Sequence, residues 1–257
     1  MHYHEFAPSP ALAATVLRYW QFEVAATLAG PVPHTALPDG CVSLIVFRTP
    51  PLAPPTALWA GPRTTHFRQI MAPGSAFAGI RFVPGAARAL FGLDMAGLKN
   101  ASRLAQPELE QQPLLAAIVR QLATLPLQPA ALDGLLAAAG PGSFDQLVAP
   151  LVAQILASHG RVDIGELTRQ AGRSERQVQK RFKQAVGLTM KELARSRRLR
   201  ATVVALLLAD GDYFGTLEAA GYFDQAHFSH DFGDSSGTSL REFRDYIGRI
   251  RHTAVKA

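Results

Sequence analysis

Two segments in the C-terminal half of this chain carry the same landmark residues at a nearly constant offset, and no other feature constrains the fold as strongly. Val178, Phe182 and Gly187 return as Phe228, Phe232 and Gly237, while Ala171-Gly172 returns as Ala220-Gly221 and Thr189 returns as Ser239. A fixed offset between matching residues indicates one structural unit that is used twice. The sequence therefore predicts two copies of a small helical unit in this half.

The first copy, over residues 163–187, has the pattern of two short helices joined by a tight turn. Asp163 and Ser174 each have a Glu or Gln three residues later, which is the spacing of a capped helix N-terminus. Gly172 permits the turn between the helices. In the second helix, apolar residues recur on one face and long polar side chains occupy the opposite face. This arrangement predicts a helix–turn–helix unit.

The polar face of that second helix suits double-stranded DNA. An α-helix fits the major groove of B-DNA, where Arg, Lys and Gln reach base edges, and the first turn of a helix favours a phosphate. A solvated amphipathic helix is the alternative, but the turn spacing favours DNA reading. The expected DNA contacts of the first unit are Arg173, Ser174, Arg176, Gln177, Lys180, Arg181 and Lys183.

A long helix is predicted over residues 190–209, opened by Thr189 and Glu192 in another capping pattern. About twenty residues give a rod of about 30 Å, which is close to the roughly 34 Å of one DNA turn. Its first half is basic and its second half is apolar. We therefore expect Arg195 and Arg198 to contact DNA while the rod holds two reading units in successive major grooves.

Charge separates the two copies. Arg161–Arg200 holds 12 Lys/Arg against 4 Asp/Glu, whereas Ala201–Leu240 holds no Lys or Arg and 6 acidic residues. The second unit, over 213–237, therefore keeps the aromatic residues Phe228 and Phe232 but has no cations. Its acidic residues Asp224, Asp231 and Asp234 are expected to face the phosphates with the wrong sign. Either it reads bases weakly through Gln225, His227, Ser229 and His230, or it is released for contact with protein. We expect the first unit to dominate the affinity for DNA.

The segment from about residue 146 to 246 resembles the DNA-binding domain of the AraC/XylS family of bacterial transcription regulators. The resemblance is carried by Ala171-Gly172-Arg173-Ser174, Phe182, Gly187 and the run from Gly221 to Ser229. It implies two helix–turn–helix units joined by a long helix, and regulation of transcription, with RNA polymerase as a further candidate partner. The sequence departs from the family at 230–234, where His-Asp-Phe-Gly-Asp replaces a run that usually contains basic residues.

The N-terminal half is expected to be rich in β-strands. Residues 42–47 and 76–83 are strand-like runs bounded by Gly/Pro turns, which favours a small barrel or sandwich. The predicted fold class is α+β, with a β-rich sensor or dimerisation domain over 1–104, a helical connector over 105–143 and the DNA-binding domain over 144–257. Tyr19-Trp20, the run from Leu37 to Cys41 and the run from Gly79 to Gly85 resemble a poorly characterised sensor-like module of some family members. That resemblance implies a small-molecule effector pocket, a homodimer surface, or both.

Candidate ligand residues in this half are Trp20, His34, Trp59 and Arg81. The two tryptophans are more expected in the core than in a ligand pocket. Arg81 has three readings: an inward anion anchor, a solvent-exposed residue, or a partner of Asp39. Cys41 is expected to be a small buried residue. The four N-terminal histidines lack close metal-ligand spacing apart from His2 and His4, so neither a metal nor a cofactor is expected.

Several classes of protein are disfavoured. There is no run of eighteen apolar residues and no signal pattern, so we expect a soluble, cytoplasmic protein that makes no membrane contact. A single cysteine excludes an internal disulfide framework. No acid–base pair, nucleophile elbow or phosphate-binding glycine loop indicates an enzyme. The alternatives kept are a regulator that acts mainly by protein contact, and an enzyme or metal-binding barrel fused to a DNA-binding domain.

Overall fold

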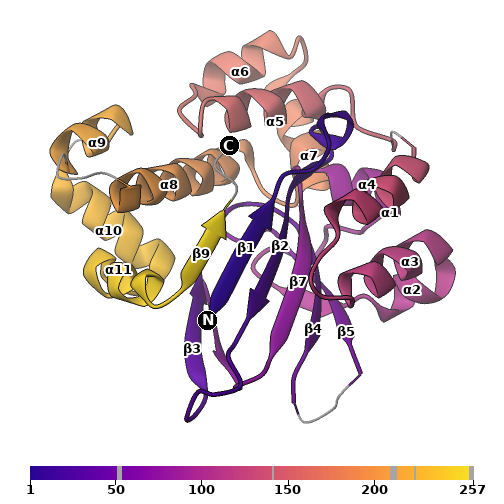
Figure 1. Ribbon diagram of the computed structural model, residues 1–257. Helices are drawn as coiled ribbons and strands as arrows, with labels where there is room; N and C mark the ends of the chain where they lie inside the picture. Colours follow the sequence, from indigo (N-terminus) through magenta and orange to yellow (C-terminus); the bar gives the residue numbers. More distant parts are fainter. Residues whose placement is uncertain (51–53, 141, 209–212, 223, 255–257) are drawn as a thin grey trace.

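The structure is a computed structural model that describes residues 1–50, 54–140, 142–208, 213–222 and 224–254. It is α+β, with strands in the N-terminal part and helices in the C-terminal part (Figure 1). This agrees with the predicted fold class.

A seven-stranded sheet forms the centre of the N-terminal part. Its strands lie in the order β8-β5-β4-β7-β2-β1-β9. All pairs are antiparallel except β1 with β9, which are parallel. The strands are β1 (His2–Phe6), β2 (Val16–Glu23), β4 (Ser43–Arg48), β5 (Thr56–Ala60), β7 (Ala76–Phe82), β8 (Ser102–Leu104) and β9 (Arg251–Ala254).

The sheet is open. The described strands therefore do not form a barrel, which was one of the two forms expected from the sequence. Its edges are β8, which has three residues, and β9, which comes from the C-terminal end of the chain. These two strands are separated by the full width of the sheet and do not pair. A second sheet consists of β3 (Val32–Ala36) and β6 (Phe67–Met71) in antiparallel register.

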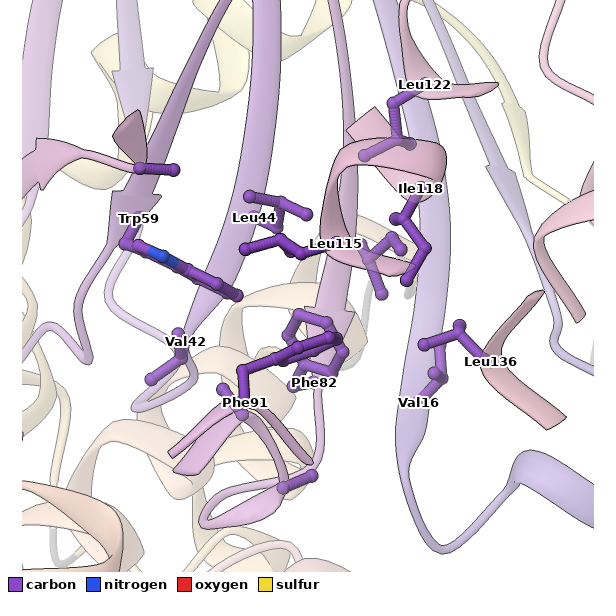
Figure 2. Close-up of a cluster of buried hydrophobic side chains, with 14 of the residues drawn as sticks. Val16, Val42, Leu44, Trp59, Phe82, Phe91, Leu115, Ile118, Leu122 and Leu136 are labelled. Carbon is purple, nitrogen blue, oxygen red and sulfur yellow. The ribbon is translucent and has the colours of Figure 1, made fainter. Parts of the chain in front are cut away.

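Helices cover one face of the large sheet and complete its core. They are α1 (Ala86–Phe91), α2 (Gln106–Gln111), α3 (Pro113–Leu122) and α4 (Pro129–Ala138), with a short 3-10 helix at Pro10–Leu12. Figure 2 shows Leu115, Ile118 and Leu122 of α3 directed towards the strands, where Leu44 and Phe82 lie. The predicted connector over 105–143 therefore packs as part of the N-terminal core.

Seven helices form the rest of the described chain. They are α5 (Val148–Ala157), α6 (Ile164–Gln170), α7 (Glu175–Val186), α8 (Met190–Leu208), α9 (Tyr213–Ala219), α10 (Gln225–Ser236) and α11 (Leu240–Gly248). One apolar cluster centres on Phe182 in α7, and another centres on Phe228 and Phe232 in α10. Helix α8 crosses between the two units (Figure 1). The predicted end of this helix, Ala209, lies outside the described residues.

No helix in the described ranges is long and apolar enough to cross a membrane.

Candidate nucleic-acid interface

Helix α7 has two chemically different faces. Val178, Phe182, Ala185 and Val186 are buried against α5, α6 and α8. The helix begins where Ser174 Oγ accepts the Gln177 N–H at 3.4 Å, and α6 begins at Asp163, which accepts the Glu166 N–H at 3.0 Å. Both N-caps lie where the sequence predicted them. The remaining face of α7 is directed away from the protein core.

That outer face carries cations without counter-ions. Arg173, Arg176, Lys180 and Lys183 are exposed, and within the described residues none of them has an ion-pair partner. Gln177 is exposed beside them, and Ser174 is exposed at the start of the helix. The structure thus brings together six of the seven residues predicted for the first unit as an open ridge of donors on one helix and its entry turn.

Arg181, the seventh residue, is held differently. Its guanidinium makes two bonds to the Asp145 carboxylate, with Nε–Oδ2 at 2.9 Å and Nη2–Oδ1 at 2.8 Å. Asp145 also accepts the Val148 N–H at 3.1 Å, at the start of α5. Arg181 therefore fastens α7 to the segment that enters α5. Its expected DNA contact stays a prediction for a side chain that is already paired.

The linker helix uses its cations to hold the second unit. Arg195 Nε donates to Asp231 Oδ1 at 2.7 Å, and the Arg198 guanidinium lies 5.4 Å from the Tyr222 ring centroid. The hydroxyl of Tyr222 donates to Asp231 Oδ2 at 2.7 Å. Burial and the bond to Asp231 raise the pKa of Tyr222. Both linker residues predicted to contact DNA are thus engaged within the protein.

The expectation that Asp231 would face phosphate is wrong. Its side chain is 8% exposed and lies between Arg195 of α8 and Tyr222, which is in the turn before α10. A buried carboxylate is tolerated there because Arg195 neutralises it and Tyr222 supplies a hydrogen bond. The acidic residue that looked like a defect in a DNA reader instead joins α10 to the linker helix.

Two further arginines of α8 face the N-terminal part. Arg197 Nη1 lies 4.0 Å from Cys41 Sγ, and Arg200 Nη2 lies 4.0 Å from Glu5 Oε1. Burial, with the nearby Arg81, lowers the pKa of Arg200. The positive charge of Arg161–Arg200 is therefore divided between an exposed ridge on α7 and contacts inside the protein.

The second reading helix, α10, presents a polar face that contains no Lys or Arg. Gln225, His227, Ser229 and His230 are exposed on it, so weak reading of bases and contact with protein both stay predictions. Asp224 caps the helix and accepts the His227 N–H at 2.7 Å, so this carboxylate serves the helix terminus. Asp234 lies 3.5 Å from His230 Nε2. The second unit keeps the geometry of the first but offers no side chain with a fixed positive charge.

The four candidate ligand residues do not share a site among the described residues. Trp59 is fully buried against Phe82 and Phe91 (Figure 2). Trp20 covers Gly79 within the sheet. Trp59 is a core residue, as the sequence favoured, whereas Trp20 is partly buried against the cluster that contains Phe22.

The other two candidates make specific polar contacts. His34 Nδ1 lies 2.5 Å from the hydroxyl of Tyr246 in α11. Arg81 pairs with Glu5 at 3.0 Å and Asp39 at 2.7 Å, which was one of its three expected readings. Cys41 is buried as expected, and this burial raises the pKa of its thiol to about 12. No group of three or more potential metal ligands gathers in the described part of the chain.

A cleft of about 240 Å³ lies where the N-terminal part meets α7, and sequence reasoning missed it. We name it the joint cleft. Its polar lining comes from Arg88 in α1, from Ser143 and Asp145 before α5, and from Arg181 and Gln184 in α7. These segments are distant in the sequence, so only the tertiary fold brings them together.

Two separate parts of the chain match known families. Residues 4–103 match a domain of unknown function (DUF6597), and residues 167–246 match a helix-turn-helix domain. The C-terminal domain of AraT, a response regulator from Geobacillus stearothermophilus, is 19% identical with a TM-score of 0.36, covering 44% of this chain and 92% of that chain.

A second solved structure, ToxT from Vibrio cholerae O395, is 9% identical with a TM-score of 0.45, covering 88% of this chain and 95% of that chain. ToxT of Vibrio cholerae strain SCE256, bound to an unsaturated fatty acid, is 10% identical with a TM-score of 0.44, covering 87% and 93%. No curated protein matches this chain.

Proposed function

We propose that this chain, a member of the AraC/XylS family of helix–turn–helix transcription regulators, binds DNA mainly through its first unit. The observation that carries the proposal is the exposed ridge on α7. Arg176, Lys180 and Lys183 reach solvent without an ion-pair partner in the described ranges. Such cations neutralise phosphates and read base edges at no cost in broken ion pairs.

The contrast with the second unit supports the same proposal. Helix α10 carries no Lys or Arg, and the nearest linker cation, Arg195, is committed to Asp231. Gln225 and His230, which are exposed on α10, are able to hydrogen-bond with bases. They supply little of the electrostatic attraction that dominates the affinity for DNA. Contacts with RNA polymerase and with a second copy of the chain stay predictions from the sequence.

Footprinting on the DNA that flanks the gene for this protein tests the proposal. We expect strong protection in one major groove and weak protection about 10 base pairs away, where the second unit would lie. Both segments should fade together as salt is raised, because the phosphate contacts of the first unit hold the whole chain on the DNA. Equal protection of two adjacent grooves at every salt concentration would contradict the proposal.

We further propose that the chain responds to a small anionic effector bound in the joint cleft. Arg88 and Arg181 outnumber Asp145 there by one positive charge, which suits a carboxylate or phosphate group. Arg88 is exposed and has no ion-pair partner within the described residues. Because Arg181 belongs to α7, an anion that draws it from Asp145 would change how the reading helix is held. Such a ligand acts only if it binds one arrangement better than the other.

Thermal unfolding with citrate and with inorganic phosphate tests this second part. Either anion should raise the melting temperature of the wild type, as a ligand specific to the folded state does. The rise should be lost in Arg88→Ala and kept in Arg48→Ala, which removes an exposed arginine outside the cleft. Equal shifts in the two variants would exclude the joint cleft as the binding site.

A further inference from the structure

One short loop of the N-terminal part contacts three elements of the DNA-binding half. This β5–β6 loop comprises residues 61–66 and joins the large sheet to the small one. Its first contact is with the first unit. A Cβ atom at Gly187, which follows α7 with a φ of +82°, would lie 3.2 Å from Pro62 Cγ and 2.9 Å from Met95 Cε. The first reading helix therefore ends closely packed on the loop.

The second contact is with the linker helix. The hydroxyl of Ser196, in the first half of α8, donates to the backbone carbonyl of Arg63 at 3.4 Å. Gly40 donates its N–H to the same carbonyl at 3.3 Å. Ser196 is itself buried. The loop thus meets the rod between the two reading units.

The third contact is with the end of the second reading helix. The His66 N–H donates to the Ser235 carbonyl at 2.6 Å, and Arg68 Nη2, at the start of β6, donates to the Gly237 carbonyl at 2.6 Å. The last carbonyls of a helix lack partners within the helix and carry partial negative charge. The N-terminal part therefore adds two hydrogen bonds at the C-terminal end of α10, where Gly237 is the C-cap residue. A Cβ atom at Gly237 would lie 2.3 Å from His66 Cε1.

The loop is braced from behind. Thr64 N donates to Asn100 Oδ1 at 2.7 Å, and Asn100 Nδ2 donates to Thr64 Oγ1 at 3.0 Å. The Asn100 N–H donates to the Pro62 carbonyl at 3.0 Å, and the Arg63 guanidinium lies 4.5 Å from the Phe67 ring centroid. The bonds to Asn100 tie the first part of the loop, from Pro62 to Thr64, to the segment before β8, whereas His66 at the other end is bonded to Ser235.

We propose that the β5–β6 loop fixes the relative orientation of α7 and α10, and so sets how the two reading helices are presented to DNA. Gly187 and Gly237 are equivalent positions in the two units, and they rest on Pro62 and His66 of the same loop. A displacement of the loop therefore acts on both helices together. The meaning for transcription rests on the proposed function, but the orientation itself is measurable without DNA.

Spin labels on the two reading helices report that orientation. Gln179→Cys in α7 and Asp234→Cys in α10 place labels at exposed positions, while the native Cys41 is buried. The distance between the labels is then measured by pulsed electron resonance in the free, full-length protein. A single narrow distribution is expected. A failure of DNA binding would leave this measurement unaffected, so the two proposals fail separately.

The matched pair Gly237→Ala and Gly221→Ala tests the loop. Both glycines have positive φ, +62° and +79°, so both variants carry similar backbone strain. At Gly221 nothing lies within 4 Å of the added methyl group, whereas at Gly237 the methyl group would strike His66. Gly237→Ala should broaden the distance distribution and Gly221→Ala should not. Adding His66→Ala to Gly237→Ala removes the obstructing ring and should narrow the distribution again.

Equal distributions for Gly237→Ala and Gly221→Ala would overturn the proposal. If Gly237→Ala loses helix content by circular dichroism, Arg68→Ala and Arg48→Ala decide the question. Each removes an exposed guanidinium that donates to a backbone carbonyl, but Arg68 donates to Gly237 across the interface and Arg48 to Ala123 within the N-terminal part. Arg68 lies in β6, two residues after the loop, so broadening in Arg68→Ala alone supports the proposal that this part of the chain orients α10, and identical widths refute it.

Discussion

Replacing Arg176 and Lys180 by alanine should weaken DNA binding without harming the fold. Both side chains are exposed and lack ion-pair partners in the described part of the chain, so their removal leaves no buried charge behind. Stability should change by no more than about 0.5 kcal/mol. If each cation contacts one phosphate, the slope of log affinity against log salt should fall by about 1.8, because each contact contributes about 0.9. A base contact by Arg176 would add about 1–3 kcal/mol of lost affinity, or roughly 5- to 150-fold.

Fluorescence anisotropy with labelled DNA from the flanking region, at 50–200 mM salt, measures both quantities. Two controls separate the causes. Arg48→Ala with Arg120→Ala removes the same charge from exposed positions in the N-terminal part and should leave the slope unchanged. Gln225→Ala with His230→Ala trims the second reading helix and should cost less than the α7 pair. The reasoning is refuted if the α10 variant loses as much affinity as the α7 variant, or if the α7 variant keeps the wild-type slope.

Three further outcomes follow from the contacts. Phe182→Ala, at a fully buried position, should cost about 3–5 kcal/mol of unfolding free energy and abolish DNA binding, measured by urea denaturation and anisotropy. Asp231→Ala should destabilise the protein by about 1–3 kcal/mol and leave DNA affinity no higher, because it strands Tyr222 and Arg195 instead of removing a charge that repels phosphate. Burial lowers the pKa of His34 to about 4 from its usual 6.5. The stability that the neutral imidazole contributes above pH 6.5 should therefore be lost as the pH falls towards 4, by up to about 1.4 kcal/mol of unfolding free energy per pH unit. Urea titrations at several pH values should show a flatter pH dependence for His34→Gln.

Local signals explain what the sequence revealed about the reading units. A cap and its partner lie three residues apart, and an apolar face repeats every three or four residues, so Asp163, Ser174 and Phe182 were placed correctly from neighbouring positions alone. The internal repeat added the second unit, although its charges differ. These features depend on interactions within one helix or between adjacent helices.

Long-range pairing explains what the sequence did not reveal. The sequence predicts an exposed carboxylate at Asp231, but in the structure this carboxylate is buried beside Arg195 of another helix. The spacing of Arg181 places it on the cationic face of α7, but its guanidinium forms an ion pair with Asp145, which precedes α5. The contact between His66 and Ser235 joins residues that no periodicity relates. In each case the decisive partner is chosen by the tertiary fold, so charge counting along the chain overestimated how much basic surface is left for DNA.

The parallel pairing of β9 with β1 has a consequence for biosynthesis. His2 in β1 is translated before both reading units, whereas its ladder partner Arg251 is translated only after them. Until then β1 presents an unpaired edge, which is the kind of surface that recruits strands from other polypeptides. Nascent or C-terminally shortened protein should therefore aggregate more readily than the finished chain, and a bulky fusion placed directly after β9 would threaten solubility before it threatened DNA recognition.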